Sequence, residues 1–328
     1  MMKKKSFSHI IRAIRRRFYR YLLHLLGLYF YRSYWHFLWV GKKDEPNSSY
    51  FYLAAKPNPG AGIGHQMANW IAGYWYAKDW GLKFAHIPFS SSQWEDFLGF
   101  GIGEGKMTDI KKSGWKVRRV PIFHEKNQQE VNLVKDIISS YSGKKVIFLC
   151  EQDQFYKNQY GVMKEIQEKF IHAPARHKES LIYSKDNLNI AIHVRRGDIL
   201  LDPNNPNLTM RYLSNDYFDK VLSQVVSHYS SISTKPVHIY FFSQGTPLDY
   251  PEFEKYSNLH WCMEMNAQES FLHMVKADIL ITSKSSFSYK PALLNREGIK
   301  ICPKNFWHGY PNTSDWIMSE NDGTINWD

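Results

Sequence analysis

The chain of 328 residues is long enough for two domains, each with its own hydrophobic core. A content of 43% hydrophobic and 16% aromatic residues excludes an intrinsically disordered protein. The formal net charge is +11, but the whole excess lies in residues 1–43, which hold eleven Lys and Arg and no acid. Residues 44–328 are left with 31 basic and 31 acidic residues, and a neutral body excludes charge-driven binding of nucleic acid.

The N-terminal arm, residues 1–43, is predicted to associate with a membrane. A basic stretch is followed by an aromatic and apolar run over 21–31, then by Arg32 and a second aromatic run over 33–40. The uncharged run is about half of the roughly 20 residues that a spanning helix needs, and Arg32 would be costly in hydrocarbon. We therefore expect an interfacial helix on an anionic surface, peripheral to the cytoplasmic face of the membrane.

Other interpretations of the arm stay open at this point. A single spanning anchor with a basic cytoplasmic end is one, of the Golgi type if the chain is eukaryotic. A helix docked on the protein's own body is another. A cleavable secretory signal is disfavoured, because Arg32 interrupts the apolar region.

The first half after the arm begins with a polar linker, 42–49. Expected strands are 50–55, 82–87 and 146–149. One expected helix follows the glycine loop 57–64 and runs to about Trp80, and a second covers 161–172. Residues 90–145 have an irregular, mixed pattern, and the polar stretch 173–186 resembles a domain junction.

The second half alternates more regularly between strands and helices. Expected strands are 189–194, 237–242, 279–282 and 299–302, and expected helices are 214–229, 268–276 and 287–296. Such alternation indicates a parallel sheet with crossover helices. The predicted fold class is α/β, with an N-terminal domain over 44–180 and a C-terminal domain over 181–328 that form two Rossmann-type halves facing a cleft.

The run Asn189-Ile-Ala-Ile-His193-Val-Arg195-Arg196-Gly197-Asp198 carries the strongest functional signal. An apolar strand ends in two arginines, at the position where ligands bind in open α/β sheets. A guanidinium is a planar, permanently charged fork that matches phosphate oxygens. We predict a site for a phosphorylated donor; the alternative is structural pairing of an arginine with Asp198 or another carboxylate.

Two further segments resemble anion sites. Gly60, Gly62 and Gly64 lie between a strand and a helix, where His65 and Gln66 can bond a phosphate or an acceptor, although an ordinary tight connection explains the glycines equally well. The segment 281–288 places Ser285 and Ser286 at a helix start, where plain N-capping is the alternative. Together with the arginines these segments suggest a diphosphate held without metal, since the chain has no Asp-x-Asp pair to clamp a divalent cation. Its three distant cysteines form no zinc motif.

The hexapeptide His193-Val-Arg195-Arg196-Gly197-Asp198 resembles the hallmark motif of GDP-fucose-dependent fucosyltransferases, shared by their α1,2, α1,6 and protein O-fucosyl branches. The remaining motifs are most similar to those of the α1,2 branch, glycosyltransferase family 11. They are Gly62-Ile-Gly64-His65-Gln66-Met67, Leu213-Ser-Asn-Asp-Tyr217-Phe218, Tyr240-Phe-Phe-Ser243, Ser285-Ser286-Phe287-Ser288, and Pro303-Lys304 with Trp307. The similarity covers most of 50–318. The chain departs from the family at His65, at Gln244-Gly245 and at Tyr289-Lys290-Pro291.

The resemblance implies a GT-B fold, GDP-fucose as the donor, inversion at the transferred sugar and no metal or other cofactor. Arg195 would bind the β-phosphate and assist departure of GDP, with Arg196 in support. His193 would lie near the guanine, Glu269 would read the guanine edge, and the donor site would also include Ser243, Ser285 and Ser286. Asp198 and Asp202 are the candidates for the general base.

The predicted protein is therefore an inverting, metal-independent fucosyltransferase of glycan biosynthesis that transfers fucose to a glycan hydroxyl, by α1,2 linkage to galactose. Its expected partners are GDP-fucose, a glycan or lipid-linked glycan, and an anionic membrane surface, with no nucleic acid. The alternatives are an α1,6-type or other GDP-sugar transferase of the same fold, and a catalytically inactive module that binds a glycan or nucleotide.

Overall fold

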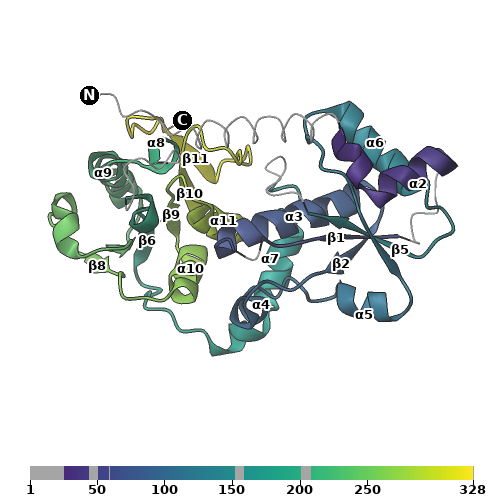
Figure 1. The fold of residues 1–328 in the computed structure, drawn as a ribbon. Helices are drawn as coiled ribbons and strands as arrows, with labels where there is room; N and C mark the ends of the chain where they lie inside the picture. Colours follow the sequence, from purple (N-terminus) through teal and green to yellow (C-terminus); the bar gives the residue numbers. More distant parts are fainter. Residues whose placement is uncertain (1–25, 44–50, 59, 152–158, 201–207, 328) are drawn as a thin grey trace, which may run out of the picture. The chain divides into compact units, whose positions relative to one another are not determined.

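The fold is taken from a computed structural model that describes residues 26–43, 51–58, 60–151, 159–200 and 208–327 (Figure 1). Contacts divide the chain into two compact units. Unit 1 comprises Met1–Lys56, Tyr76–Ile87 and Glu104–Asp153, and unit 2 comprises Pro57–Trp75, Pro88–Gly103 and Gln154–Asp328. Three segments of the expected N-terminal domain, Pro57–Trp75, Pro88–Gly103 and 154–180, are thus grouped with the C-terminal residues.

Unit 1 is built on a five-stranded parallel sheet in the order β3-β2-β1-β5-β4. Its strands are β1 (Phe51–Ala55), β2 (Lys83–His86), β3 (Gly105–Lys106), β4 (Lys116–Arg119) and β5 (Val146–Cys150). The central strands are apolar because helices cover both of their faces. Ala54, Ala85 and Ile147 pack in one cluster, and Phe51 meets Phe148 edge-to-face at 5.6 Å.

The expectation of an irregular segment over 90–145 is wrong. Those residues hold β3, β4 and three helices: α4 (Ser92–Leu98), α5 (Met107–Lys112) and α6 (Gln128–Ser139). The two strands lie at the edges of the sheet and are polar and short, so they lack the apolar run that marks a buried strand. Helix α6 starts at Asn127, whose Oδ1 accepts from the backbone N–H of Gln129 and Glu130.

The described part of the arm forms η1 (Gly27–Phe30) and α2 (Arg32–Val40). One face of α2 packs against the rest of unit 1. There the buried Ser33 donates to the carbonyl of Arg119 at 2.6 Å, and His36 stacks on Tyr141 at 3.8 Å. Residues 26–40 therefore do what the docked-helix alternative predicts, while the other face of α2 stays exposed. Among the described residues no helix combines the length and the apolar character needed to cross a bilayer.

Unit 2 contains a six-stranded parallel sheet in the order β11-β10-β9-β6-β7-β8. Its strands are β6 (Leu188–His193), β7 (Val237–Phe242), β8 (Leu259–Trp261), β9 (Ile279–Ile281), β10 (Ile299–Pro303) and β11 (Trp316–Ser319). Numbered within the unit this is the Rossmann order 3-2-1-4-5-6 read from the opposite edge. The expected α/β class with two Rossmann-like halves is confirmed. Strands β8 and β11 were not expected, because each is a short edge strand.

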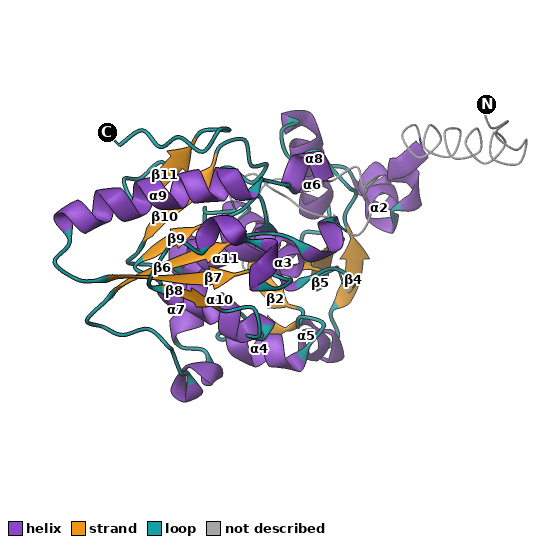
Figure 2. Ribbon diagram, turned by 90° about the vertical axis from the view of Figure 1, so that its left-hand side faces the viewer, coloured by secondary structure: helices purple, strands orange, loops and turns teal. Residues whose placement is uncertain are grey.

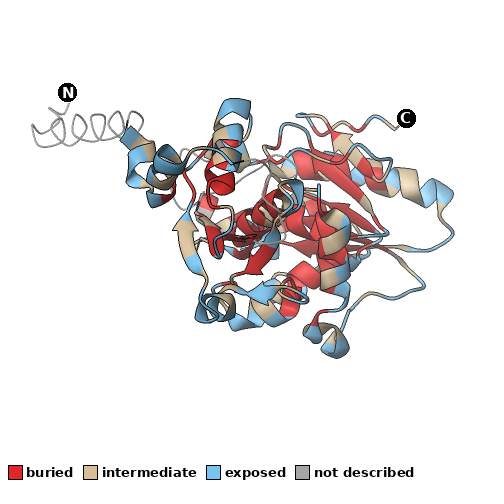
Figure 3. Ribbon diagram, turned by 90° about the vertical axis from the view of Figure 1, so that its right-hand side faces the viewer, coloured by how far each residue is buried: buried red, intermediate tan, exposed pale blue. Residues whose placement is uncertain are grey.

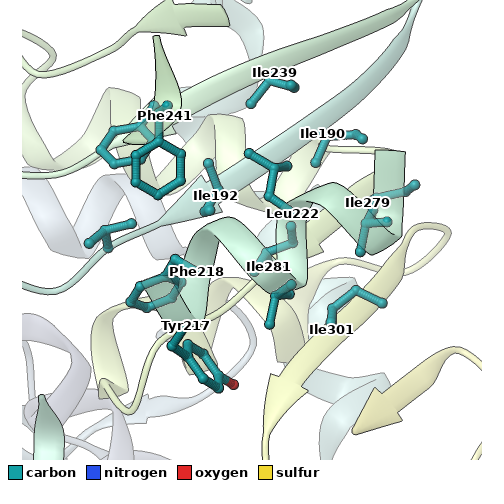
Figure 4. Packing of buried hydrophobic residues seen from close by; sticks show 14 of the residues in the cluster. Ile190, Ile192, Tyr217, Phe218, Leu222, Ile239, Phe241, Ile279, Ile281 and Ile301 are labelled. Carbon is teal, nitrogen blue, oxygen red and sulfur yellow. The ribbon is translucent and has the colours of Figure 1, made fainter. Parts of the chain in front are cut away.

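The core of unit 2 lies between this sheet and α9 (Asn215–Ile232), which crosses it in Figure 2. Alternate strand residues point at α9, among them Ile190 and Ile192 of β6, and meet Phe218 and Leu222 of the helix (Figure 4). The opposite face carries α10 (Ala267–Lys276) and α11 (Ser286–Leu294).

The other helical segments of unit 2 are α4, α7 (Met163–Ile171), η3 (Pro174–Lys178), η4 (Gly197–Ile199), α8 (Leu208–Arg211), η5 (Pro247–Asp249) and η6 (Pro251–Phe253). Helix α3 (Ile63–Asp79) begins in unit 2 and ends in unit 1.

Candidate functional site

The candidate site lies at the carboxyl edge of the sheet in unit 2. All of its strands are parallel, so the residues that follow β6, β7 and β9 emerge at one edge. The chain runs from β6 to β7 and β8 on one side, then returns to place β9 on the other side of β6. This reversal is the topological switch point, where open α/β sheets bind ligands. The arginine motif follows β6 and the serine segment follows β9.

A buried hydrogen bond joins these two segments. His193, at the end of β6, pairs through Nδ1 with the hydroxyl of Ser283 at 2.8 Å, and its ring lies 5.6 Å from that of Phe287. Burial, followed by the charges of Arg195 and Arg196, lowers the pKa of His193 to about 3. The imidazole is therefore neutral at pH 7 and adds no charge to a site that already holds two guanidinium groups.

The two arginines have different surroundings. The side chain of Arg196 is only 6% exposed and donates to the carbonyl of Arg195 at 2.8 Å and to Oδ1 of Asn215 at 2.5 Å. Its guanidinium also lies 4.7 Å from the ring centroid of Tyr212. Asn215 is held in turn by the carboxylate of Glu252 at 3.1 Å. Arg196 is thus fixed inside the protein, in contact with the start of α9.

Arg195 is half-buried and makes its own contacts within the protein. Its charge acts on His193, and its backbone carbonyl is the acceptor that orients Arg196. The alternating direction of side chains sends Val194 and Arg196 towards α9, which leaves Arg195 as the guanidinium with greater access to solvent.

Gly197 lets the chain turn directly after the arginines. Its φ of +69° belongs to the left-handed region, and a Cβ there would lie 1.7 Å from Oε1 of Gln244, which follows β7. A side chain at this position would therefore collide with the next strand's loop as well as strain the backbone.

The serine segment caps a helix, and it also supplies a cation. The Ser285 hydroxyl accepts from the backbone N–H of Phe287 at 3.2 Å, as the N-capping alternative predicts, and Ser286 pairs with Nε2 of His308 at 3.0 Å. Lys284 is half-buried between β9 and α11, and burial lowers its pKa. No hydrogen bond or ion pair joins its ammonium to another described residue, so a positive charge and the N-terminus of α11 lie next to each other.

The glycine loop packs directly against the serine segment. A Cβ on Gly64 would lie 2.8 Å from the carbonyl carbon and oxygen of Ser286, so only glycine permits this approach. Gly62 has open space around it and accepts through its carbonyl from the backbone N–H of His65 and Gln66. The side-chain amide of Gln66 is occupied within the protein, bonding Ser90 through both of its ends.

Sequence reasoning missed a buried basic cluster behind this contact. Lys290 is completely buried, donates to Oε1 of Gln159 at 2.5 Å and has a pKa well below its ordinary value because of burial. His308, stacked on Tyr289 at 4.8 Å, has its pKa lowered well below the ordinary value by burial and then by Lys290 and His65. Lys290 lies among apolar residues of helix α11. A lysine in such an apolar stretch of sequence is the signal that could have indicated its burial.

Ser243 and Glu269, also expected in the donor site, have structural partners. The Ser243 hydroxyl donates to the carbonyl of Val194 at 2.7 Å and lies 2.5 Å from the Tyr250 hydroxyl, so it ties the ends of β6 and β7 together. Glu269 is exposed and completes the capping box of α10, since its carboxylate accepts from the backbone N–H of Asn266.

The candidates for the general base cannot be placed. Asp198 lies in η4, but its side chain is not among those that the structure describes, and Asp202 falls outside the described residues. In the described part of the chain, no group of three or more His, Cys, Asp or Glu side chains is arranged to hold a metal ion.

Comparison with known proteins finds likeness in structure only. No protein-family model matches the chain, and no curated protein matches it in sequence. Similar solved structures include POFUT1 in complex with GDP-fucose, with 13% identity, 77% of this chain and 97% of that chain covered and a TM-score of 0.45. Others are the fucosyltransferase NodZ from Bradyrhizobium (11% identity, 75% and 93% covered, TM-score 0.44) and NodZ alpha-1,6-fucosyltransferase co-crystallized with GDP (11%, 85% and 97%, 0.43). These solved structures are fucosyltransferases, and at such distance the likeness carries no statement about what this chain binds.

Proposed function

We propose that the protein is an inverting fucosyltransferase that takes fucose from GDP-fucose. One observation carries the proposal: His193 and Ser283 join the arginine motif to the serine segment at the switch point of a Rossmann-ordered sheet. The segments that this hydrogen bond joins carry the half-buried guanidinium of Arg195, the ammonium of Lys284 and the N-terminus of α11. Their combined charge suits a nucleoside diphosphate, which carries its negative charge on the oxygens of two adjacent phosphates.

The reaction follows from this arrangement. An acceptor hydroxyl oxygen attacks C1 of fucose while the bond from C1 to the β-phosphate oxygen breaks, and the bonding electrons leave with GDP. Arg195, Lys284 and the N-terminus of α11 stabilise the charge that develops on the leaving diphosphate. The proton of the hydroxyl passes to a carboxylate, for which Asp198 and Asp202 are the candidates. Because the cations are supplied by the protein, transfer is expected to proceed without a divalent metal.

For the acceptor we propose galactose in a glycan or lipid-linked glycan, joined by an α1,2 linkage. This rests on the motifs shared with the α1,2 branch, including Gly64, Tyr217 and Ser286. The α1,6 linkage named for NodZ is the alternative, and linkage analysis of the methylated product separates the two.

We also propose that the arm holds the enzyme at a membrane, on the cytoplasmic face, where lipid-linked acceptors are available. The exposed aromatic face of η1 and α2 and the eleven basic residues of 1–43 support this assignment.

The donor is tested by thermal denaturation with GDP, GDP-fucose, GDP-mannose, UDP and NAD, each with and without EDTA. GDP and GDP-fucose should raise the melting temperature equally with and without the chelator, since a ligand that binds the native state stabilises it. Stabilisation by NAD or UDP alone, or loss of the GDP effect in EDTA, would contradict the proposal. Binding of GDP-fucose without release of GDP to any glycan acceptor would identify an inactive binding module instead.

A further inference from the structure

Unit 1 contains a cationic cavity of about 420 Å³. Its lining comes from α2, from the residues around β4 and from the loop before β5, and it consists of Arg32, His36, Gly114, Lys116, Arg118, Tyr141, Lys144, Lys145 and Val146. Five of these side chains are lysine or arginine and none is acidic. The volume is several times that of a phosphate group, so a phosphate with an attached polar group fits inside it.

Among the described residues, no carboxylate is paired with the cations of the cavity, in contrast to their neighbours. Close by, Lys42 pairs with Asp136 at 3.0 Å, and Arg119 and Lys56 share the carboxylate of Glu151. Within the described residues, the side chains of Arg32, Lys116 and Lys145 form no ion pair or hydrogen bond. Like charges gathered around one cavity repel each other, and an anion inside it relieves that repulsion.

His36 keeps the cavity wall in place without adding charge. Burial, and then the neighbouring cations led by Lys144, hold the pKa of His36 below its ordinary value. The neutral ring accepts from the ammonium of Lys144 at 2.6 Å through Nε2, which leaves Nδ1–H to donate to the hydroxyl of Ser140 at 3.1 Å. The lysine is thereby fixed beside the cavity while it retains its charge.

The same helix that supplies Arg32 carries an exposed aromatic face. Most of its ribbon is coloured as exposed or intermediate in Figure 3. The large apolar residues exposed on η1 and α2 are Leu26, Tyr29, Phe30, Trp35, Leu38, Trp39 and Val40, with Phe30 68% and Trp39 85% exposed. Trp35 donates from Nε1 to the carbonyl of Tyr29 at 2.8 Å, so the surface is already ordered. Tryptophan and tyrosine favour the boundary between hydrocarbon and water.

We propose that this cavity binds the phosphate headgroup of an anionic phospholipid while the aromatic face of η1 and α2 enters the surrounding interface. An anion in free solution would use the cavity but not the apolar face, and a second copy of this chain would bring like charge to the cavity. Only a membrane surface presents phosphate and hydrocarbon side by side. This inference deepens the proposed membrane association. It rests on the proposed fucosyltransferase activity only in explaining why a position at a membrane is useful to the protein.

The test is cosedimentation of the full chain with vesicles of phosphatidylcholine and with vesicles that also contain phosphatidylglycerol. Lys116→Ala combined with Lys145→Ala removes two unpaired cations from the cavity. Binding to the anionic vesicles should fall about twenty-five-fold, since each of the two cations near the surface contributes about fivefold. The matched control is Lys111→Ala combined with Lys112→Ala, which removes the same charge from the exposed α5 and should lower binding by less than about fivefold.

Two further measurements make the outcomes decisive. Glycerol 3-phosphate should displace the protein from anionic vesicles at a constant ionic strength, and Trp35→Ala combined with Trp39→Ala should weaken binding to them. Equal losses in the cavity and control variants would mean diffuse attraction and would overturn the site, as would self-association through the aromatic face with no binding to vesicles. Fucose transfer to a soluble acceptor, measured without vesicles, should be unchanged in the cavity variant, so failure of the proposed activity is recognised separately.

Discussion

The two units place positive charge near a parallel sheet in opposite ways. In unit 1 the cations around the cavity are mostly exposed, whereas in unit 2 the guanidinium of Arg196 is buried and hydrogen-bonded. Exposed cations around an open cavity suit the phosphate of an anionic headgroup that arrives from a surface. A buried, fixed guanidinium such as that of Arg196 instead orders its neighbours, because it holds the Arg195 carbonyl and Asn215 in place. The contrast separates the proposed membrane contact in unit 1 from the proposed donor site in unit 2.

The largest expected effect separates the two arginines. Arg195→Ala should reduce fucose transfer by about 10²–10³-fold while the protein stays folded, because a charge that stabilises the leaving group is lost. Arg196→Ala should instead lower the free energy of unfolding by about 1–3 kcal/mol, since Asn215 and the Arg195 carbonyl lose their donor. Activity measured beside chemical denaturation checks both, and a stable, inactive Arg196→Ala would reverse the assignment.

The contact between the glycine loop and the serine segment is tested by Gly64→Ala. The added Cβ meets the backbone of Ser286, so we expect a loss of about 3 kcal/mol in the free energy of unfolding and weaker GDP binding. Gly60→Ala in the same loop is the control, because the Asn58 side chain, at 3.9 Å, is the one contact that the described residues offer to its Cβ. Equal urea denaturation midpoints for the two variants would refute the close approach.

Burial of neutral histidines in unit 2 predicts sensitivity to acid. The folded-state pKa of His193 is about 3, below the unfolded value of about 6.5, so its contribution to stability is complete above pH 6.5 and is lost as the pH falls towards 3.

His193→Asn, which can still pair with Ser283, should reduce the slope of unfolding free energy against pH between 6.5 and 4 by up to about 1.4 kcal/mol per pH unit. Denaturation series at several pH values measure this slope, and the exposed His172→Asn controls for loss of a histidine. An unchanged slope in His193→Asn would mean that the ring is already protonated in the folded protein.

Lys284 offers a smaller test of the anion site. Lys284→Ala should weaken GDP binding by about tenfold, which is the effect of one half-buried charge near a phosphate, and Lys284→Arg should retain most of the affinity. Lys276→Ala, at the exposed end of α10, is the control for the loss of charge. Calorimetric titration with GDP distinguishes them, and equal affinities for the two alanine variants would remove Lys284 from the site.

The smallest expected effect concerns the docking of α2 in unit 1. Ser33→Ala removes the buried hydrogen bond to the Arg119 carbonyl and should cost about 1 kcal/mol of stability. Ser113→Ala removes a bond of the same kind that is exposed to water, and should cost less. A larger loss at Ser113 would mean that α2 is not docked.

Much of unit 2 was predictable because its strands are apolar runs bounded by turn residues. Strands β6, β7, β9 and β10 begin and end within one or two residues of the ranges expected from their sequences. The divergence of the two arginines also follows from strand alternation, which sends Val194 and Arg196 to one side.

Other features could not be predicted, because they depend on contacts distant in sequence. Nothing near Gly64 in the sequence indicates Ser286, and nothing near Lys290 indicates Gln159. The docking of α2 depends on Tyr141 and on the Arg119 carbonyl, far along the chain from Ser33 and His36. The polar edge strands β3 and β4 lack the apolar pattern that identifies a strand.

The interleaved segments of the two units constrain the order in which the units can fold during synthesis. Pro57–Trp75 leaves the ribosome early, yet Ser286, against which Gly64 packs, is synthesised more than two hundred residues later. Unit 1 has all of its strands once β5 has emerged, whereas the start of α3 must wait with its apolar face unprotected. Residues 181–328 expressed alone would leave the backbone of Ser286 uncovered, so a shortened chain that retains unit 2 must also retain 57–75, 88–103 and 154–180.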